Sequence, residues 1–329
     1  METGKLSSEN LQEMIIDRIK KVGDDVLIRP GVGEDCSALS FGEYACVLST
    51  DPITGAASEI GRLAVHINCN DIASSGVKPI ALMLTILVPP ETSQDELNMI
   101  MDQASNEAYK LGVDIIGGHT EITSAVNRPL VSATAIGKQV KDRLVTSSGS
   151  KVNDKLILTK NVALEGTGIL AFDKADELKS ILSQSEIDQA QAMLDNISVI
   201  PEGLIAGEYG VSAMHDVTEG GVLGAVWEMC EASGLGCLIE DSALPVEIVT
   251  RKICAHFNID PYKLISSGCM LITVNEDRSE GLMKRFEEEG IPASIIGEMT
   301  REKAVLLKSR DGINPIDPPQ ADELYKVVD

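Results

Sequence analysis

Four short polar segments in the first half of the chain have the residue types of a metal and phosphate site. They are Pro30–Asp35, Ser49–Asp51, Asn68–Asp71 and Gly117–Glu121. The last three follow apolar, strand-like runs, so we expect their side chains to face one cleft. Carboxylates gathered in one cleft repel one another unless a cation holds them, and Mg²⁺ takes oxygen ligands while leaving room for phosphate. The pattern predicts a metal and nucleotide site. The alternative for each single Asp is a turn or a helix N-cap.

The composition favours two soluble domains and argues against nucleic acid and membrane as partners. A length of 329 residues fits two domains of ordinary size. At a net charge of −23 the surface repels phosphate backbones and acidic headgroups, and aromatic residues for stacking bases make up only 3% of the chain. A bound nucleotide would therefore need metal ions between it and the acidic cleft.

The sequence also indicates a cytoplasmic protein. The first 20 residues lack the apolar core of a signal peptide, and no apolar run reaches the ~18 residues of a membrane span. The seven cysteines include no Cys-x-x-Cys pair, which argues against a disulfide framework and a structural zinc site. We expect the reducing cytosol, with most cysteines in the core.

The elements of the first half alternate strands with helices. Expected strands cover Tyr44–Thr50, Leu63–Ile67, Pro79–Val88, Val113–Ile116 and Leu130–Gly137. Expected helices cover Ser8–Lys20, with Lys5 in a flexible segment before it, the short Ile72–Gly76, and a helix that begins with a Ser93/Glu96 capping box and ends at Gly112. Pro79–Val88 is almost wholly apolar, as in a central strand buried on both faces. This order predicts an α/β fold in which helices cover a sheet.

The second half restarts after a polar stretch, 145–154, where we place the boundary between domains 1–146 and 147–329. Expected strands cover Lys155–Thr159, Val211–His215, Cys237–Ile239, Met270–Val274 and Ser294–Gly297. Expected helices cover Ala175–Ser180, Glu186–Ile197, Pro201–Tyr209, Val222–Glu231 and Ser279–Glu289. The polar tail from Asp317 is expected to be mobile.

Other motifs carry less weight. The chain has no P-loop, and Gly166–Ala171 fits a dinucleotide-binding pattern without the second strand that such a site requires. His66, on an expected apolar strand, is interpreted as a core residue. By contrast, Asp216 and Glu219 precede Gly220-Gly221 at the start of a helix, where backbone N–H groups can bind a polar ligand. The alternative there is a capping turn.

Taken in order, these segments resemble the aminoimidazole ribonucleotide (AIR) synthetase superfamily over nearly the whole chain. The matching segments are Gly31–Asp35, Ser49–Asp51, Asn70–Pro79, Gly117–Glu121 and His215–Gly221. Gly4-Lys5-Leu6 and Ser266-Ser267-Gly268 are most similar to its HypE-like members, which take part in hydrogenase maturation.

The resemblance implies a two-domain protein that pairs its N-terminal sheet with that of a second subunit and binds ATP between its domains through Mg²⁺. The implied metal ligands are Asp35, Asp51 and Asp71. The implied nucleotide-binding residues are Gly33, Glu34, Thr50, Asn70, Gly117, Gly118 and Thr120. The implied catalytic residues are His119, Glu121 and Asp216. The family has Asp where this chain has His119, so His119 is expected to contact phosphate or substrate and Glu121 to offer the replacement carboxylate.

The chain departs from each named member of the superfamily. HypE carries its reactive cysteine at the end of a tail, whereas the last cysteine here is Cys269. Selenophosphate synthetase has a reactive residue in an N-terminal loop, and no cysteine precedes Gly31 here. The purine enzyme has a His-Ser-Asn-Gly loop where this chain has 163–168.

We therefore predict an ATP-dependent, Mg²⁺-dependent enzyme of HypE-like type that phosphorylates a carbonyl, amide or phosphate oxygen of a small or protein-borne acceptor. Its chemistry would be that of a kinase, a ligase or cyclase, or a dehydratase. The alternatives are a nucleotide-binding regulatory or scaffold protein without turnover, and a small-molecule kinase of the thiamine-monophosphate kinase type. A homodimer is expected because Pro79–Val88 and Leu130–Gly137 are apolar on both faces, more than helices on one side could cover.

Overall fold

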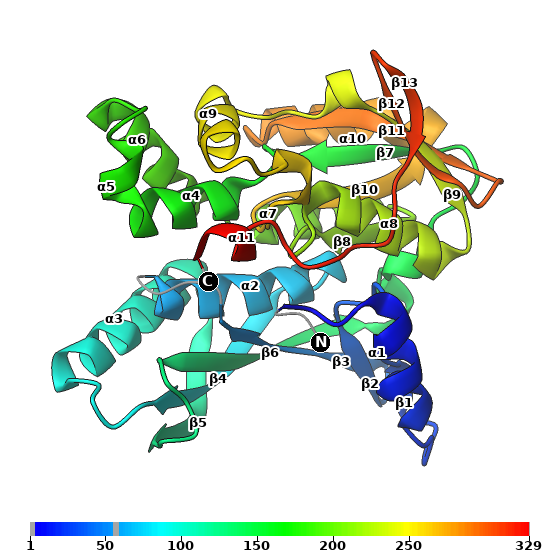
Figure 1. Ribbon diagram of the computed structural model, residues 1–329. Coiled ribbons are helices and arrows are strands. Elements are labelled where there is room, and N and C mark those ends of the chain that lie inside the picture. Colours follow the sequence, from blue (N-terminus) through cyan, green and yellow to red (C-terminus); the bar gives the residue numbers. More distant parts are fainter. Residues whose placement is uncertain (1–3, 55–58, 329) are drawn as a thin grey trace.

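The structure is a computed structural model, and it describes residues 4–54 and 59–328. In this part of the chain two sheets lie on opposite sides of a central helix (Figure 1). The first has the strand order β1 (Val26–Ile28), β2 (Ser37–Phe41), β3 (Tyr44–Ile53), β6 (Leu130–Val140), β4 (Pro79–Val88) and β5 (Asp114–Ile122). The second has the order β13 (Gly312–Pro315), β12 (Val305–Ser309), β9 (Gly236–Glu240), β11 (Ala293–Thr300), β7 (Asp154–Thr159), β10 (Met270–Asn275) and β8 (Ala213–Asp216). The predicted α/β fold is confirmed.

The helices pack on these sheets and on one another. They are α1 (Ser8–Met14), α2 (Ile60–Ser74), α3 (Gln94–Leu111), α4 (Leu164–Asp173), α5 (Ala175–Leu178), α6 (Gln184–Gln191), α7 (Ile200–Tyr209), α8 (Gly221–Ser233), α9 (Ile248–Phe257), α10 (Glu276–Glu288) and α11 (Tyr325–Val328). Helix α3 begins with the predicted capping box and ends at Gly112, which is left-handed at φ 67°. Both ends were predictable because they depend on local residues alone.

The central helix α2 corrects the predicted strand Leu63–Ile67. It packs against α3, β3 and β6 on one side and α7 and β8 on the other, and every residue except Arg62 is buried. A helix enclosed on all sides has no polar stripe, so its sequence cannot be told from a buried strand by periodicity. His66 is a buried residue of this helix, and its Nε2 lies 2.9 Å from Glu107 Oε2 of α3.

The first sheet is covered on one face only, which corrects the prediction that Pro79–Val88 is buried on both faces. Leu84 and Ile86 of β4 point into the core, whereas Ile80 and Met83 on the other face are 47% and 44% exposed. Strand β4 is therefore hydrogen-bonded on both edges, to β6 and to β5, but one of its apolar faces is open in the single chain.

Three glycines bring the two halves into direct backbone contact where α2 meets α7. A Cβ atom built on Gly203 of α7 would lie 2.2 Å from the Ala73 carbonyl oxygen of α2. One built on Gly207 would lie 2.7 Å from Cα of Gly76, which has φ +72°. Only glycine allows the two helices to approach this closely.

The C-terminal segment is docked on the second half, in contrast to the predicted mobile tail. The Asp322 carboxylate accepts hydrogen bonds from the backbone N–H groups of Gly220, Ile265 and Leu324 at 2.7, 3.1 and 2.8 Å. Leu324 is 1% exposed. The segment therefore contributes to the structure beside the start of α8.

Candidate active site

Four aspartates from four elements converge between the two sheets. Asp35 lies in the turn before β2, Asp51 in β3, Asp71 in α2 and Asp216 at the end of β8. Burial raises the pKa of Asp71 and of Asp216 well above the ordinary value, and the neighbouring carboxylates raise both further. Asp51 is exposed at the edge of the cluster, but desolvation by the surrounding protein raises its pKa to about 6 against the opposing effect of the Lys5 ammonium. The negative charge of the four aspartates therefore exceeds the positive charge of the groups around them.

Asp216 is the least compensated member of this cluster. Its side chain is 1% exposed, and neither carboxylate oxygen has a hydrogen-bond partner among residues 4–54 and 59–328. A buried carboxylate without partners is costly unless a cation completes its environment. Asp71 differs, because its Oδ2 accepts a hydrogen bond from Ser49 Oγ at 2.5 Å. Asp216, with Asp35, is therefore the natural centre of a cation site.

His215 lies in the same cluster but is held as a cation by its neighbours. Its Nδ1 is 2.9 Å from Asp35 and its Nε2 is 3.1 Å from Glu228 of α8. Burial lowers the pKa of His215, but these two carboxylates outweigh burial and raise it well above the ordinary value. Since both ring nitrogens are engaged, His215 is unsuited to bind a metal ion. The donors that remain are oxygens, as Mg²⁺ prefers.

Lys5 and Glu228 are site residues that our sequence reasoning missed. Lys5 Nζ donates to Glu228 Oε1 at 2.8 Å, and the Lys5 backbone N–H donates to Glu219 Oε2 at 3.1 Å. Tyr325 Oη donates to the other oxygen of Glu219 at 2.7 Å. Glu219 is therefore hydrogen-bonded to both the N-terminal and the C-terminal segment beside the site. The only signal in the sequence was the Gly4-Lys5-Leu6 resemblance, because Glu228 looks like an ordinary helix residue.

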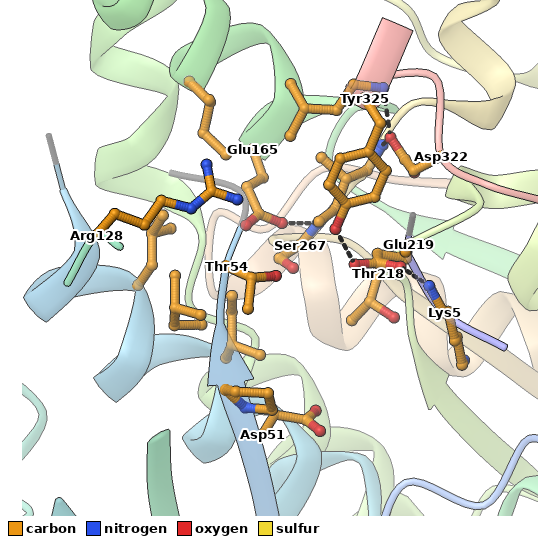
Figure 2. A pocket seen from close by; sticks show the side chains of 18 residues that line it. Lys5, Asp51, Thr54, Arg128, Glu165, Thr218, Glu219, Ser267, Asp322 and Tyr325 are labelled. Carbon is orange, nitrogen blue, oxygen red and sulfur yellow. Dashed lines mark hydrogen bonds between the residues drawn. The ribbon is translucent and has the colours of Figure 1, made fainter. Parts of the chain in front are cut away.

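A pocket of about 520 Å³ opens beside the aspartate cluster (Figure 2). Asp51 lies at one end, and Lys5, Glu219 and Tyr325 lie along one side. Glu165 of α4 projects into the pocket from the second half of the chain. The remaining wall is largely apolar, from Ile53, Leu63, Ile67, Ile169, Ile265 and Leu324. Asp51 belongs to both the cluster and the pocket lining, so the two adjoin.

Of the predicted nucleotide-binding residues in the early segments, Gly33 and Glu34 lie near the cluster, whereas the Thr50 side chain lies on the open face of the first sheet beside Thr134. Gly33 has φ +77°, and a Cβ there would lie 2.9 Å from the Glu228 carbonyl oxygen. Burial raises the pKa of Glu34, although Ser148 lowers it by hydrogen bonding. Thr50 Oγ1 donates to the Ala133 carbonyl oxygen at 2.9 Å.

Asn70 lies in the buried part of α2 and links it to the second half. Its Nδ2 donates to the Ile197 carbonyl oxygen at 2.7 Å, and its Oδ1 accepts from the Val199 N–H at 2.9 Å. These two hydrogen bonds account for an asparagine at position 70 without any contact to a ligand. The nucleotide-binding role of Asn70 stays a prediction.

The predicted residues of the glycine-rich segment lie elsewhere in the single chain. Gly117, Gly118, His119, Thr120 and Glu121 belong to β5, an edge strand separated from β3 and Asp51 by β4 and β6. Three strand spacings amount to roughly 14 Å. The side chains of His119 and Glu121 are 66% and 54% exposed, and their Nε2 and Oε2 atoms lie 3.4 Å apart. One chain does not bring them to the aspartates, and their predicted roles stay predictions.

No helix in the described part of the chain is long and apolar enough to cross a membrane. The predicted cytoplasmic location stays a prediction.

Known proteins resemble this chain over most of its length. The family model for the AIR synthase related protein N-terminal domain matches residues 33–139, and that for the C-terminal domain matches residues 151–308. The chain is 26% identical over 334 residues to a Methanocaldococcus jannaschii protein whose name refers to hydrogenase expression and formation, with 96% of each chain covered. It is 25% identical over 307 residues to carbamoyl dehydratase HypE of Rhodobacter capsulatus, covering 89% of this chain and 88% of that protein. A solved structure of HypE in complex with ATP matches with a TM-score of 0.73 at 19% identity, covering 98% and 97% of the two chains.

Proposed function

This chain belongs to the AIR synthase related protein family, and from that premise we propose that it is an ATP-dependent, Mg²⁺-dependent phosphotransferase of HypE-like type. The acceptor would be a carbonyl, amide or phosphate oxygen. In the transfer, the bond from the γ-phosphorus to the bridging oxygen of ADP breaks as the bond to the acceptor oxygen forms. The observation that carries the proposal is the converging aspartate cluster with the unpartnered carboxylate of Asp216.

The residues present fit Mg²⁺. Atoms of Asp35 and Asp216 lie within ligand spacing of each other, and Asp51 and Asp71 add oxygen donors beside them. These four carboxylates would hold the ion, which supplies charge compensation for the phosphate groups. The His215 imidazolium fixes the Asp35 carboxylate through its Nδ1–H. Lys5 is held at the pocket edge by Glu228, where its ammonium can face the phosphates of a nucleotide.

A thermal-shift assay with Mg·ATP, Mg·ADP and Mg·GTP tests the proposal. At 100 times the dissociation constant a ligand adds about 2.7 kcal/mol of stability. At roughly 0.7 kcal/mol/K of unfolding entropy for a chain of this size, that is a rise of about 4 °C in Tm. Asp216→Asn should lose the rise, whereas Asp142→Asn, at an exposed position, should keep it. A wild-type Tm unchanged by every nucleotide at millimolar concentration would contradict the proposal.

The relative named carbamoyl dehydratase directs the choice of acceptors for turnover measurements. ADP formation should rise with one class among amides, carbamoyl compounds and phosphate monoesters. Tight ATP binding without stimulated ADP formation would instead favour the alternative of a nucleotide-binding regulatory protein.

We also propose a homodimer through the open face of the first sheet. Ile80 and Met83 of β4 are exposed there, and Ile116 of β5 is 59% exposed. Pairing two such faces buries the apolar patch about a two-fold axis. Met83→Asp should halve the mass measured by light scattering, whereas Ile181→Asp, at a residue 40% exposed elsewhere, should not. A monomeric wild-type protein at micromolar concentration would refute the dimer.

A further inference from the structure

A second cavity, of about 450 Å³, lies on the second half of the chain and shares no lining residue with the pocket beside the aspartates. Its walls come from the end of β9 and the turn after it, from the first turn of α9, and from the turn between β12 and β13. None of the site residues predicted from the sequence lines this cavity. It is therefore separate from the proposed nucleotide site.

This cavity carries more positive than negative side chains, against the trend of the chain. Arg251, Lys308 and Arg310 line it together with Glu240 and Asp241, in a chain that has 28 Lys and Arg against 51 Asp and Glu. Lys308 Nζ is paired with Glu240 Oε1 at 2.9 Å. In the part of the chain that the structure describes, neither Arg251 nor Arg310 forms an ion pair. We call it the basic cavity, since two guanidinium groups in it can meet an anion.

The Asp241 carboxylate of the basic cavity is engaged by a neutral group. Tyr262 Oη donates to Asp241 Oδ1 at 2.8 Å. Burial and this hydrogen bond raise the pKa of Tyr262 to about 12, against the opposing effect of the Arg251 guanidinium. The phenol therefore stays uncharged at neutral pH and keeps Asp241 as its acceptor.

We propose that the basic cavity binds a small organic molecule that carries a phosphate monoester group, with Arg251 and Arg310 as its anchors. A guanidinium presents a planar fork of N–H donors that matches two oxygens of a phosphate group. Leu244 and the Tyr262 ring line the same cavity and offer apolar contact to the organic part of the ligand. This inference goes beyond the proposed function and does not depend on it.

The pocket beside the aspartates has the opposite balance of charge. Its lining holds four carboxylates and two cations, from Asp51, Glu165, Glu219 and Asp322 and from Lys5 and Arg128. The Lys5 ammonium is already paired with the Glu228 carboxylate. Without Mg²⁺ a phosphate ester is repelled there and attracted to the basic cavity. Measurements in the presence of a chelator therefore select the second site.

A titration of Tm in the presence of EDTA and at constant ionic strength tests the inference. The probes are phenyl phosphate, inorganic phosphate and the uncharged benzyl alcohol. We expect phenyl phosphate to raise Tm saturably at millimolar concentrations, inorganic phosphate to do so with weaker apparent affinity, and benzyl alcohol to have no effect. A protein that responds to neither phosphate would overturn the inference. Tighter binding of inorganic phosphate than of phenyl phosphate would overturn the assignment to an organic phosphate.

Charge-removing variants locate the response. Arg251→Gln and Arg310→Gln should each weaken the apparent affinity for phenyl phosphate by about tenfold, as expected for loss of a charge-assisted hydrogen bond. Both positions are exposed, so the ligand-free Tm should stay close to that of the wild type. Arg301→Gln is the matched control, an exposed cation before β12 that does not line the cavity, and it should leave the affinity within about twofold. Unchanged affinity in both cavity variants would overturn the inference.

Chemical protection of the wild-type protein gives a second readout. Phenylglyoxal modifies arginine side chains, and mass spectrometry of the digested protein reports each site. Phenyl phosphate should protect Arg251 and Arg310 and leave Arg301 reactive, both with EDTA and with saturating Mg·ATP. Protection that disappears with Mg·ATP would place the ligand in the nucleotide site and overturn the inference. If phenyl phosphate protects both arginines but Mg·ATP does not change Tm, the proposed function fails and the phosphate site stands.

Discussion

Glu228 should contribute strongly to the stability of the metal-free protein. It is 3% exposed, and its two oxygens bind the Lys5 ammonium at 2.8 Å and the His215 ring at 3.1 Å. Burial opposes ionisation of Glu228, but His215 and Lys5 outweigh it and lower its pKa from 4.5 to about 2. Replacing Glu228 by Gln keeps the shape, leaves the buried His215 cation with the Asp35 carboxylate alone, and removes the partner of the partly exposed Lys5 ammonium.

The magnitude follows from the lowered pKa. A difference of about 2.5 units at 1.36 kcal/mol each is roughly 3 kcal/mol, similar to the cost of breaking other buried ion pairs. A depressed carboxylate pKa contributes stability above the unfolded value of 4.5, and this contribution is lost as pH falls toward 2. The loss caused by Glu228→Gln should therefore be full at pH 7.5 and about half at pH 3.5. At pH 7.5 this corresponds to a Tm about 4 °C lower.

The assay is differential scanning calorimetry without divalent cations. Glu231→Gln is the matched control, because Glu231 lies on the same helix and is exposed. Its Tm should stay within about 1 °C of wild type, as expected for a surface substitution. Equal Tm values for the two variants at pH 7.5 would refute the reasoning, and so would a Glu228→Gln deficit that does not shrink in acid.

Two further substitutions give distinct outcomes. Asp51→Asn should raise the Tm of the metal-free protein at pH 7.5 and abolish its stabilisation by Mg·ATP. The pKa of Asp51 is raised to about 6, so its contribution to folding stability is present below pH 3.8 and is lost as pH rises through 6. If calorimetry gives Asp51→Asn the wild-type Tm at pH 7.5, the ionised Asp51 side chain does not destabilise the fold. Tyr325→Phe should cost about 1 kcal/mol and make the C-terminal segment more sensitive to limited proteolysis, because the hydrogen bond to Glu219 is lost. Cleavage at the wild-type rate would show that this contact does not hold the segment.

The sequence was informative where structure depends on neighbouring residues. The Ser93 capping box, the Gly112 end and the strand that begins at Tyr44 are local features and lie where predicted, although the strand runs on through Asp51 to Ile53. Asp35, Asp51 and Asp71 also come together as expected, although Asp71 arrives on a helix rather than after a strand. The shared chemistry of the aspartates was therefore a better guide than the type of element that carries each one.

The errors have a common physical origin in long-range contacts. Helix α2 looked like a strand and a turn because burial on all sides removes its polar stripe. The tail from Asp317 looked mobile because polarity alone does not reveal that Asp322 accepts three backbone hydrogen bonds. Glu228 was missed because its partners, Lys5 and His215, are distant in sequence or buried in another element.

The glycine contact between α2 and α7 limits how the two halves of the chain can move. Gly203 lies against the Ala73 backbone and Gly207 against Gly76, so no flexible side chains separate the two helices at this point. Interfaces packed at backbone distance resist sliding, and large hinge motion usually needs loop residues that change conformation. We therefore expect the two halves to move together as one rigid unit. Opening of the site would then require movement of the segments around Lys5 and Tyr325, which we expect on the timescale of loops rather than of domains.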